Sequence, residues 1–469
     1  MRESNLLHSS VSERAGERSV VARRTRWGVE RELGLDSPPW RLGFLALAGM
    51  MGLVLVFLAI HPFVAYVEKG GDHYTYLAQS FTQGRLSVDS VPDSYADVVL
   101  WHGHKYLPFG PLPAVLLIPF LPILQAGFPS VSIGHLFTLI NMGLFYAVLG
   151  RAGIIGARRR WALLLFFFST SYFSTILDLT ADNSWLLAQV ITATCLLLAF
   201  WETLGRRRPA LMGFYLGLAA LTRFTTLFCL PFFVWMIWRN PKSEAAGLEG
   251  SESADTGART IGHEENGAGQ RHGRLNPSLV RPTLMFFAGL VGPVALLFAY
   301  NYARFGNPLE SGYSQAALYY NVLNQARAQG LFSLVHIPKN LVMFLFQGPV
   351  AYPSINAPVL EFPYLVPSPW GMSILLTTPA IAYALRANLK QPLVQACWLG
   401  VLFTMLPIFT YYGIGYVQFG YRYALDFIPL LVILAAIGFG AHPSRRVGAL
   451  VLIGMAVNLW GVLLLTHRA

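Results

Sequence analysis

The stretch GGDHYTYLAQSFTQGRLSVD, residues 70–89, places an acid, a histidine and two tyrosines just after a long apolar segment ends. Beyond Asp72, apolar and aromatic residues recur at helical spacing, so this acid lies at or just before a helix start. Asp is a good helix N-cap, which is one interpretation. The other is a general base at a membrane-edge cavity, where partial desolvation raises a carboxyl pKa toward a useful value.

A second polar group follows in DVVLWHGHKYLPFGPLPA, residues 97–114, which contains His102, His104 and Lys105. A His-x-His pair can ligate a metal ion, but no third ligand is identifiable by spacing, so no metal or other cofactor is assigned. We expect Lys105 to contact a phosphate, because an ammonium group beside aromatic residues at a membrane interface suits an anionic head group. The alternative is that the aliphatic part of Lys105 packs on apolar surface and its ammonium group reaches water without binding a ligand.

Two arginines stand close to apolar segments. Arg223, in GLAALTRFTTLF, has apolar helix on both sides, a costly position that usually faces a cavity or a partner. It fits either phosphate binding or a salt bridge with Asp178 or Asp182. Arg422 lies four residues before Asp426 in YVQFGYRYALDFIPLL, the spacing of a local ion pair on one helix face. Its planar guanidinium also suits phosphate recognition.

The elements that position these residues are membrane helices. The chain of 469 residues is 54% hydrophobic and 12% charged, and its continuously apolar segments repeatedly reach the length of about 20 residues that spans a bilayer. Such segments predict an all-α polytopic membrane protein, because helices satisfy their own backbone in lipid. We count eleven spans, at roughly 42–67, 131–150, 161–177, 185–203, 210–222, 224–238, 284–303, 371–386, 394–412, 427–441 and 447–465.

Charge sets the orientation of these spans. The formal charge of +11 comes from arginines clustered between apolar segments, which is the positive-inside pattern and not a nucleic-acid signal. The basic loop 151–160 falls inside, with 206–208, only if the proline-rich segment 108–128 lies along the outer interface and does not cross. We therefore expect interfacial helices there, and another interfacial helix pair within 331–349. The three cysteines, all in apolar segments, predict no disulfide.

This topology divides the chain into four parts. Residues 1–40 form a basic, disordered cytoplasmic tail, and residues 41–238 form an N-terminal transmembrane module with the first outer loop at 68–130. A flexible cytoplasmic loop at 239–283 precedes the C-terminal module 284–469, whose outer loop is 304–370. We expect the N-terminus to be cytoplasmic.

Taken together, GDHYTYLAQSFTQGRL, KYLPFGPLPAVLLIPF, LGLAALTRFTTLF, NYARFGNPLESGY and QFGYRYALDFIP resemble bacterial members of the GT-C glycosyltransferase superfamily, which includes protein mannosyltransferases and aminoarabinose transferases. The resemblance runs in order from about residue 42 to 440, and it implies a location in a bacterial inner membrane. It implies a polyprenyl-phosphate sugar donor, an acceptor on the outer face and inverting transfer with Asp72 as the catalytic base. Lys105, Arg223 and Arg422 would bind the donor phosphate. The expected substrate-binding residues are His73, Tyr74, Tyr76, Tyr106, Glu310, Tyr313, Gln418 and Tyr423.

The chain departs from this family in two respects. Many relatives carry two adjacent acids where this chain has Asp72 followed by His73. Some relatives also carry a large soluble C-terminal domain, which we do not expect here. The acceptor is therefore open: a glycan, a lipid or a protein. The competing hypothesis is a transporter or lipid flippase, which should place charges deep in several spans. Here the polar residues concentrate in two outer loops, which favours an enzyme.

Overall fold

The computed structural model describes residues 52, 73–91, 97–125, 130–176, 184–239, 277–316, 321–354, 358–416 and 418–465. Within these ranges the chain is mostly helical, and four helices are long and apolar enough to cross a membrane: Ile133–Arg151, Leu279–Phe305, Pro392–Thr410 and Arg445–Leu464. The predicted tail 1–40, the first span except residue 52, and most of the loop 239–283 lie outside the described residues. The count of eleven spans stays a prediction.

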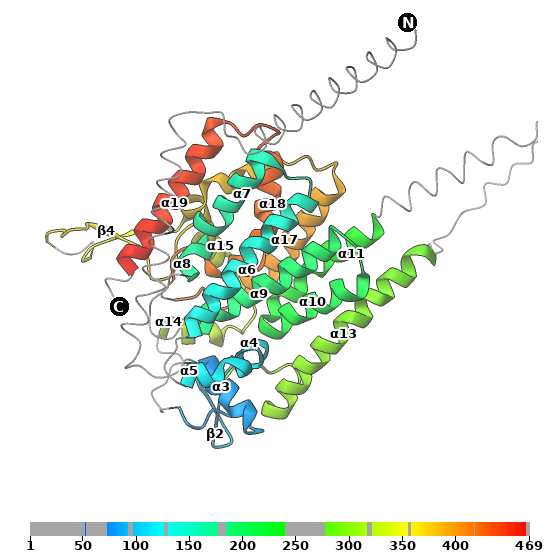
Figure 1. The fold of residues 1–469 in the computed structure, drawn as a ribbon. Helices are drawn as coiled ribbons and strands as arrows, with labels where there is room; N and C mark the ends of the chain where they lie inside the picture. The colour runs from blue at the N-terminus through cyan, green and yellow to red at the C-terminus, as the bar shows by residue number, and fades with distance from the viewer. Residues whose placement is uncertain are drawn as a thin grey trace, which may run out of the picture.

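Helical segments occupy the ranges expected from residue 131 onward, although several are short or broken. They are α6 (Ser130–Arg151), α7 (Gly156–Phe168), α8 (Ser171–Ile176), α9 (Ser184–Thr203), α10 (Pro209–Thr222), η3 (Phe224–Cys229), α11 (Leu230–Trp238), α13 (Pro277–Phe305), α16 (Ile374–Thr377), η5 (Pro379–Arg386), α17 (Pro392–Thr410), η6 (Arg422–Asp426), α18 (Ile428–Gly438) and α19 (Arg445–Leu465). Figure 1 shows them side by side in one bundle. Helix α13 begins at Pro277, and the division of the chain into a loop at 239–283 and a module from 284 stays a prediction.

Helices α10 and α13 pack through small residues. Gly213 lies directly against the carbonyl oxygen of Phe286, and Gly289 lies against that of Ala210. Glycines at such points allow two helix backbones to approach closely, a common way for apolar helices to associate in membranes. Gly217 meets Pro293 farther along, so the two helices run in the same direction.

The chain reverses direction at Arg223. After α10, the ring of Phe224 lies 6.4 Å from that of Phe298, whereas the ring of Phe233 in α11 lies 5.8 Å from that of Phe286. Residues 224–238 therefore run antiparallel to α13, back toward the level of Gly213. This confirms the hairpin expected from the basic flanks on both sides of residues 209–238.

The turns at one end of the bundle, here called the basic end, carry the arginine clusters 151–160 and 206–208. The guanidinium of Arg159 lies 3.2 Å from the ring centroid of Tyr146, and that of Arg151 lies 3.8 Å from that of Trp201. The buried carboxylate of Glu202 accepts hydrogen bonds from Nε and Nη2 of Arg208 at 3.0 and 2.7 Å. These arginines therefore also hold the helix ends in place.

The opposite end, here called the loop end, carries short elements. They are α3 (His73–Thr82), the β1–β2 hairpin (Val99–Trp101 and His104–Tyr106), α4 (Leu112–Leu117), η2 (Ile118–Phe120) and α5 (Leu121–Gln125). They lie beyond the ends of α9 and α10 in Figure 1. The proline-rich segment is thus split into pieces of six residues or fewer, because each proline removes a helical hydrogen bond.

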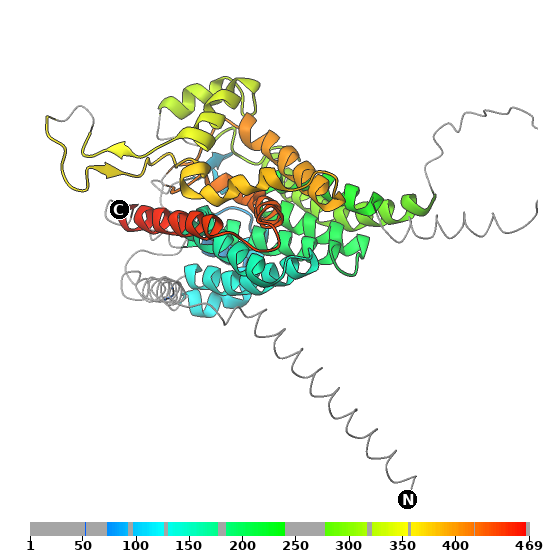
Figure 2. The same ribbon diagram turned by 90° about the horizontal axis from the view of Figure 1, so that it is seen from above.

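The second loop region contains α14 (Asn321–Ala328), η4 (Leu334–His336), α15 (Ile337–Phe346) and the strands β3 (Val350–Ala351) and β4 (Leu365–Val366). The expected helix pair within 331–349 is instead one helix, α15, entered through the turn η4. The two small antiparallel hairpins also make a purely α-helical description too simple. Figure 2 shows the β3–β4 arm extending sideways from the bundle.

Candidate functional site at the loop end

Arg223 occupies the break between α10 and η3. Its backbone is extended, with φ −141° and ψ 106°, and its N–H closes the last turn of α10 by donating to the carbonyl oxygen of Ala219 at 2.8 Å. An extended residue between two helical segments directs its side chain away from the axis of both. The guanidinium therefore leaves the hairpin turn and reaches η6, on a segment 203 residues later.

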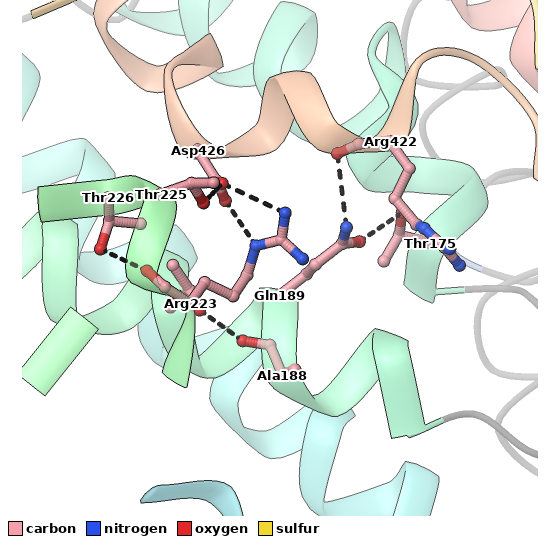
Figure 3. Close-up of polar contacts among 9 residues, drawn as sticks. Thr175, Ala188, Gln189, Arg223, Thr225, Thr226, Arg422 and Asp426 are labelled. Carbon is pink, nitrogen blue, oxygen red and sulfur yellow. Dashed lines mark hydrogen bonds and ion pairs between the residues drawn. The ribbon is translucent and has the colours of Figure 1, made fainter. Parts of the chain in front are cut away.

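Asp426 receives that guanidinium. Its Oδ1 accepts a hydrogen bond from Nε of Arg223 at 2.8 Å and its Oδ2 accepts one from Nη2 at 3.1 Å, as Figure 3 shows. The hydroxyl of Thr225 donates to the same Oδ2. The Asp426 side chain is only 1% exposed and that of Arg223 is 19% exposed. Two parallel charge-assisted bonds in a buried position fix both side chains.

The partner of Arg223 differs from the expected ones. Asp178 and Asp182 lie outside the described residues, and Asp426 had been considered only as a local partner of Arg422. Residues 422–426 form a 3-10 helix, which has about three residues per turn, so positions four apart do not share a face as they would in an α-helix. Of the two interpretations of Arg422, the local pair with Asp426 is therefore not formed, and phosphate recognition stays a prediction.

Arg422 points toward α8. In Figure 3 its side chain runs toward Thr175, away from Asp426, while its backbone carbonyl accepts a hydrogen bond from Nε2 of Gln189 at 3.4 Å. Thr175 donates to Oε1 of Gln189, also at 3.4 Å. Gln189 of α9 thus links η6 to α8 and holds the backbone on which both Arg422 and Asp426 are placed.

Tyrosine rings surround the ion pair. The guanidinium carbon of Arg223 lies 5.5 Å from the ring centroid of Tyr423, and that ring lies 6.3 Å from the rings of both Tyr411 and Tyr421. Tyr313 joins the cluster, 6.2 Å from Tyr411. Burial is the main cause that raises the pKa of Tyr313; the neighbouring Tyr423 and Asp97 add to the shift, and Arg223 opposes it. The Tyr313 phenol therefore stays protonated and can donate a hydrogen bond.

The start of α3 is connected to this ion pair through the loop 107–111. Asp72 itself lies outside the described residues, but α3 begins at His73, the next residue in sequence. The ring of His73 lies 5.4 Å from that of Phe109, edge to face, and that of Tyr74 lies 5.7 Å from it. The following residue, Gly110, lies against the backbone carbonyls that immediately precede Arg223.

Lys105 belongs to the β1–β2 hairpin, where its Nζ donates to the carbonyl oxygen of Val91. The backbone N–H of Lys105 and Nδ1 of His104 both contact Asp89, at 2.9 and 3.1 Å. Burial acts to raise the pKa of Asp89, but hydrogen bonds from Ser87, Lys105 and His104 outweigh it and hold the pKa below its ordinary value. The sequence analysis did not single out Asp89 as the residue that organises this hairpin.

Other expected substrate-binding residues make structural contacts. Glu310 accepts hydrogen bonds from the N–H of Gly312 and the hydroxyl of Ser314, at 2.6 and 2.7 Å. The Gln418 amide donates to the carbonyls of Trp370 and Ile414, at 2.9 and 2.7 Å. The ring of Tyr106 packs 5.5 Å from that of Phe305. Tyr76 is half-buried on α3.

The structure therefore brings together four groups: Arg223, Asp426, Tyr313 and Tyr423. All four lie in motifs that the sequence analysis had selected. Asp426 was present in that selection with a different role. Thr225 was missed because a threonine two residues after an arginine gives no distinguishing pattern. Within the described ranges, no three His, Cys, Asp or Glu side chains gather in a way that could hold a metal ion.

Comparison with known proteins adds no assignment. The chain matches no protein-family model, no curated protein and no solved structure.

Proposed function

We propose that the protein is an integral membrane glycosyltransferase that moves a sugar from a polyprenyl-phosphate donor to an acceptor at the loop end, which we assign to the outer face. The observation that carries the proposal is the continuous contact from α3 to the ion pair. His73 packs on Phe109, Gly110 packs on the turn before Arg223, and Arg223 binds Asp426. The start of α3 and a fixed guanidinium thus belong to one packed unit, and Asp72 is the residue that precedes α3 in the sequence.

The ion pair fixes the orientation of the Arg223 guanidinium so that Nη1 can bind an anionic ligand. Asp426 engages the Nε and Nη2 edge, so Nη1 points away from the carboxylate (Figure 3). In the described part of the chain, no hydrogen bond from Nη1 of Arg223 is formed. A guanidinium whose orientation is already set loses little entropy when it binds a phosphate oxygen. Such a preorganised donor is worth most where negative charge develops in the transition state.

The chemistry then follows from these groups. Asp72 removes the proton from an acceptor hydroxyl, the acceptor oxygen forms a bond to the anomeric carbon, and the bond from that carbon to the phosphate oxygen breaks. The polyprenyl phosphate leaves with the bonding electron pair, and Nη1 of Arg223 stabilises its charge. Arg422 and Lys105 supply further positive charge at the same end. Tyr313 and Tyr423 offer ring faces and hydroxyls to the sugar.

The test is transfer of radiolabelled sugar from a polyprenyl-phosphate donor, using purified protein in nanodiscs. Asp72→Asn should lose nearly all transfer, because an amide cannot accept the proton, and Asp72→Glu should keep a measurable part. Glu361→Gln is the matched control, since it removes an exposed carboxylate on a hairpin remote from Arg223 in sequence. A folded Asp72→Asn protein with full activity would disprove the assignment of the base.

The competing transporter hypothesis makes a different prediction in the same preparation. If the protein only translocates its substrate, reconstituted vesicles should accumulate the labelled lipid or sugar and no covalent product should form. If the wild type forms covalent product and Asp72→Asn does not, this alternative is excluded.

A further inference from the structure

The β3–β4 arm, described at residues 350–354 and 358–366, carries a group of exposed apolar side chains between 359 and 365, here called its tip. Phe362 is 81% exposed and Val359 is 70% exposed, and Leu360, Tyr364 and Leu365 are also exposed. The only charged residue in the whole arm is Glu361. A cluster of exposed apolar side chains on a projecting element is costly in water and usually marks an interaction surface.

The tip has a defined shape. The N–H of Tyr352 donates to the carbonyl oxygen of Tyr364 at 2.9 Å, and the N–H of Glu361 donates to that of Tyr352 at 3.2 Å. A tight turn is closed by the N–H of Tyr364, which donates to the carbonyl oxygen of Glu361 at 2.6 Å. This turn places the rings of Phe362 and Tyr364 next to each other, 6.2 Å apart and edge to face.

The base of the arm is fixed to the bundle. The strands pair Val350 with Val366 and Ala351 with Leu365. Ser373, immediately before α16, donates from its backbone N–H to the carbonyl oxygen of Gln347 at 2.8 Å and from its hydroxyl to that of Leu345. The arm therefore emerges from a closed base between α15 and α16, and its direction is set by the fold.

That direction is sideways. In Figures 1 and 2 the yellow arm extends past the C-terminal end of α19, away from the other helices, and both views agree on this placement. Helix α19 is one of the helices long and apolar enough to cross a membrane, so its end marks the level at which lipid meets water. An element that leaves the bundle sideways at that level runs along the membrane surface.

The other hairpin at the loop end provides the contrast. The β1–β2 hairpin turns at His102 and Gly103, followed by His104 and Lys105, so its tip is polar. The two antiparallel hairpins thus present different surfaces. A polar tip suits water, whereas an apolar tip with a tyrosine suits the interface, where an aromatic ring is buried and its hydroxyl stays hydrated.

We infer that the tip of the β3–β4 arm inserts into the lipid interface of the leaflet at the loop end, with Phe362 and Tyr364 as its anchors. The arm then tethers the second loop region to the membrane beside α19. This inference rests on the membrane environment of the helices and does not depend on the glycosyltransferase proposal.

The experiment places a polarity-sensitive fluorophore on the arm tip in nanodiscs. Phe362→Cys is labelled on the full-length protein, and the three native cysteines are buried, so unsubstituted protein reports any background labelling. His102→Cys, on the polar hairpin tip, is the matched control. Quenching is measured with spin-labelled lipids and with iodide in the aqueous phase.

Insertion predicts that the label at 362 shows blue-shifted emission, loses most of its intensity to lipid quenchers and resists iodide. The label at 102 should behave in the opposite way. If the label at 362 is quenched by iodide as readily as the label at 102, the arm lies in water and the inference fails. It also fails if the label is shielded from both quenchers, because the tip would then be covered by protein, either this chain or a second copy.

A double variant tests the two rings with the label at another position, so that the label does not replace either ring. Phe362→Ser with Tyr364→Ser should lower the lipid protection of a label placed at Val359 while the thermal stability of the bundle stays unchanged, because the substituted side chains are exposed. Unchanged lipid protection would contradict the assignment of these two rings as anchors.

Discussion

Asp426 accepts two hydrogen bonds from Arg223 across 203 residues of sequence, at 2.8 and 3.1 Å. The pair joins the turn of the α10–α11 hairpin to η6, immediately before α18. It therefore connects elements from the two halves of the chain at the loop end of the bundle.

The first prediction concerns this pair. Arg223→Met and Asp426→Leu should each lower stability strongly, by about 3–5 kcal/mol, because each leaves an uncompensated charge in a buried site. The double variant should be more stable than either single variant, since it buries no isolated charge. Thermal unfolding of the purified proteins in nanodiscs measures this. Additive losses in the double variant would show that the two side chains are not coupled.

The second prediction concerns Gly110. A Cβ at this position would collide with the carbonyl oxygen of Leu221 and lie 2.7 Å from that of Thr222, both parts of the backbone just before Arg223. Gly110→Ala should destabilise the protein by about 1–3 kcal/mol, the usual cost of overpacking, and should reduce sugar transfer as well. Gly143→Ala is the control, because nothing lies within 4 Å of its added Cβ. Equal behaviour of the two variants would refute the close contact.

The third prediction is a pH dependence at the β1–β2 hairpin. The native pKa of Asp89 lies below its ordinary value of 3.8, so ionised Asp89 favours the folded hairpin. This stabilisation is complete above pH 3.8 and is lost as the pH falls through the lower native pKa. Hydrogen exchange of the Lys105 amide should therefore accelerate relative to its intrinsic rate at acid pH.

Asp89→Asn provides the matched comparison. Its Lys105 amide should exchange faster than that of the wild type at neutral pH and show little further loss of protection on acidification. A wild-type protein whose protection is the same at neutral and acid pH would count against the proposed role of Asp89.

The fourth prediction concerns Asn340, which supports the tyrosine cluster from α15. Its Nδ2 donates to the carbonyl oxygens of Phe409 and Tyr411, at 2.8 and 2.9 Å, where α17 ends. Asn340→Ala leaves these carbonyls unsatisfied and should cost about 1–3 kcal/mol. Val342→Ala, on the exposed side of the same helix, should have little effect. Comparable shifts in unfolding temperature for both variants would argue against a specific role for Asn340.

Much of the secondary structure could be predicted from local properties of the sequence. Apolar length located the helical segments from residue 131 onward, and basic flanks correctly predicted the reversal at Arg223. Prolines correctly predicted the broken helices after Pro108. Each of these is a property of a short window, because apolarity, charge and proline geometry act on the residues next to them.

The site depended on information that no local window contains. A spacing of four residues would place Arg422 and Asp426 on one face of an α-helix. Residues 422–426 form a 3-10 helix, so the two side chains lie on different faces, and Asp426 binds Arg223. The contact of Gly110 with the end of α10 and the sideways course of the apolar arm also arise only when distant segments pack together. The sequence by itself determined which segments are helical and where candidate charges stand; only the tertiary structure decided which charges meet, because that depends on backbone directions set by long-range packing.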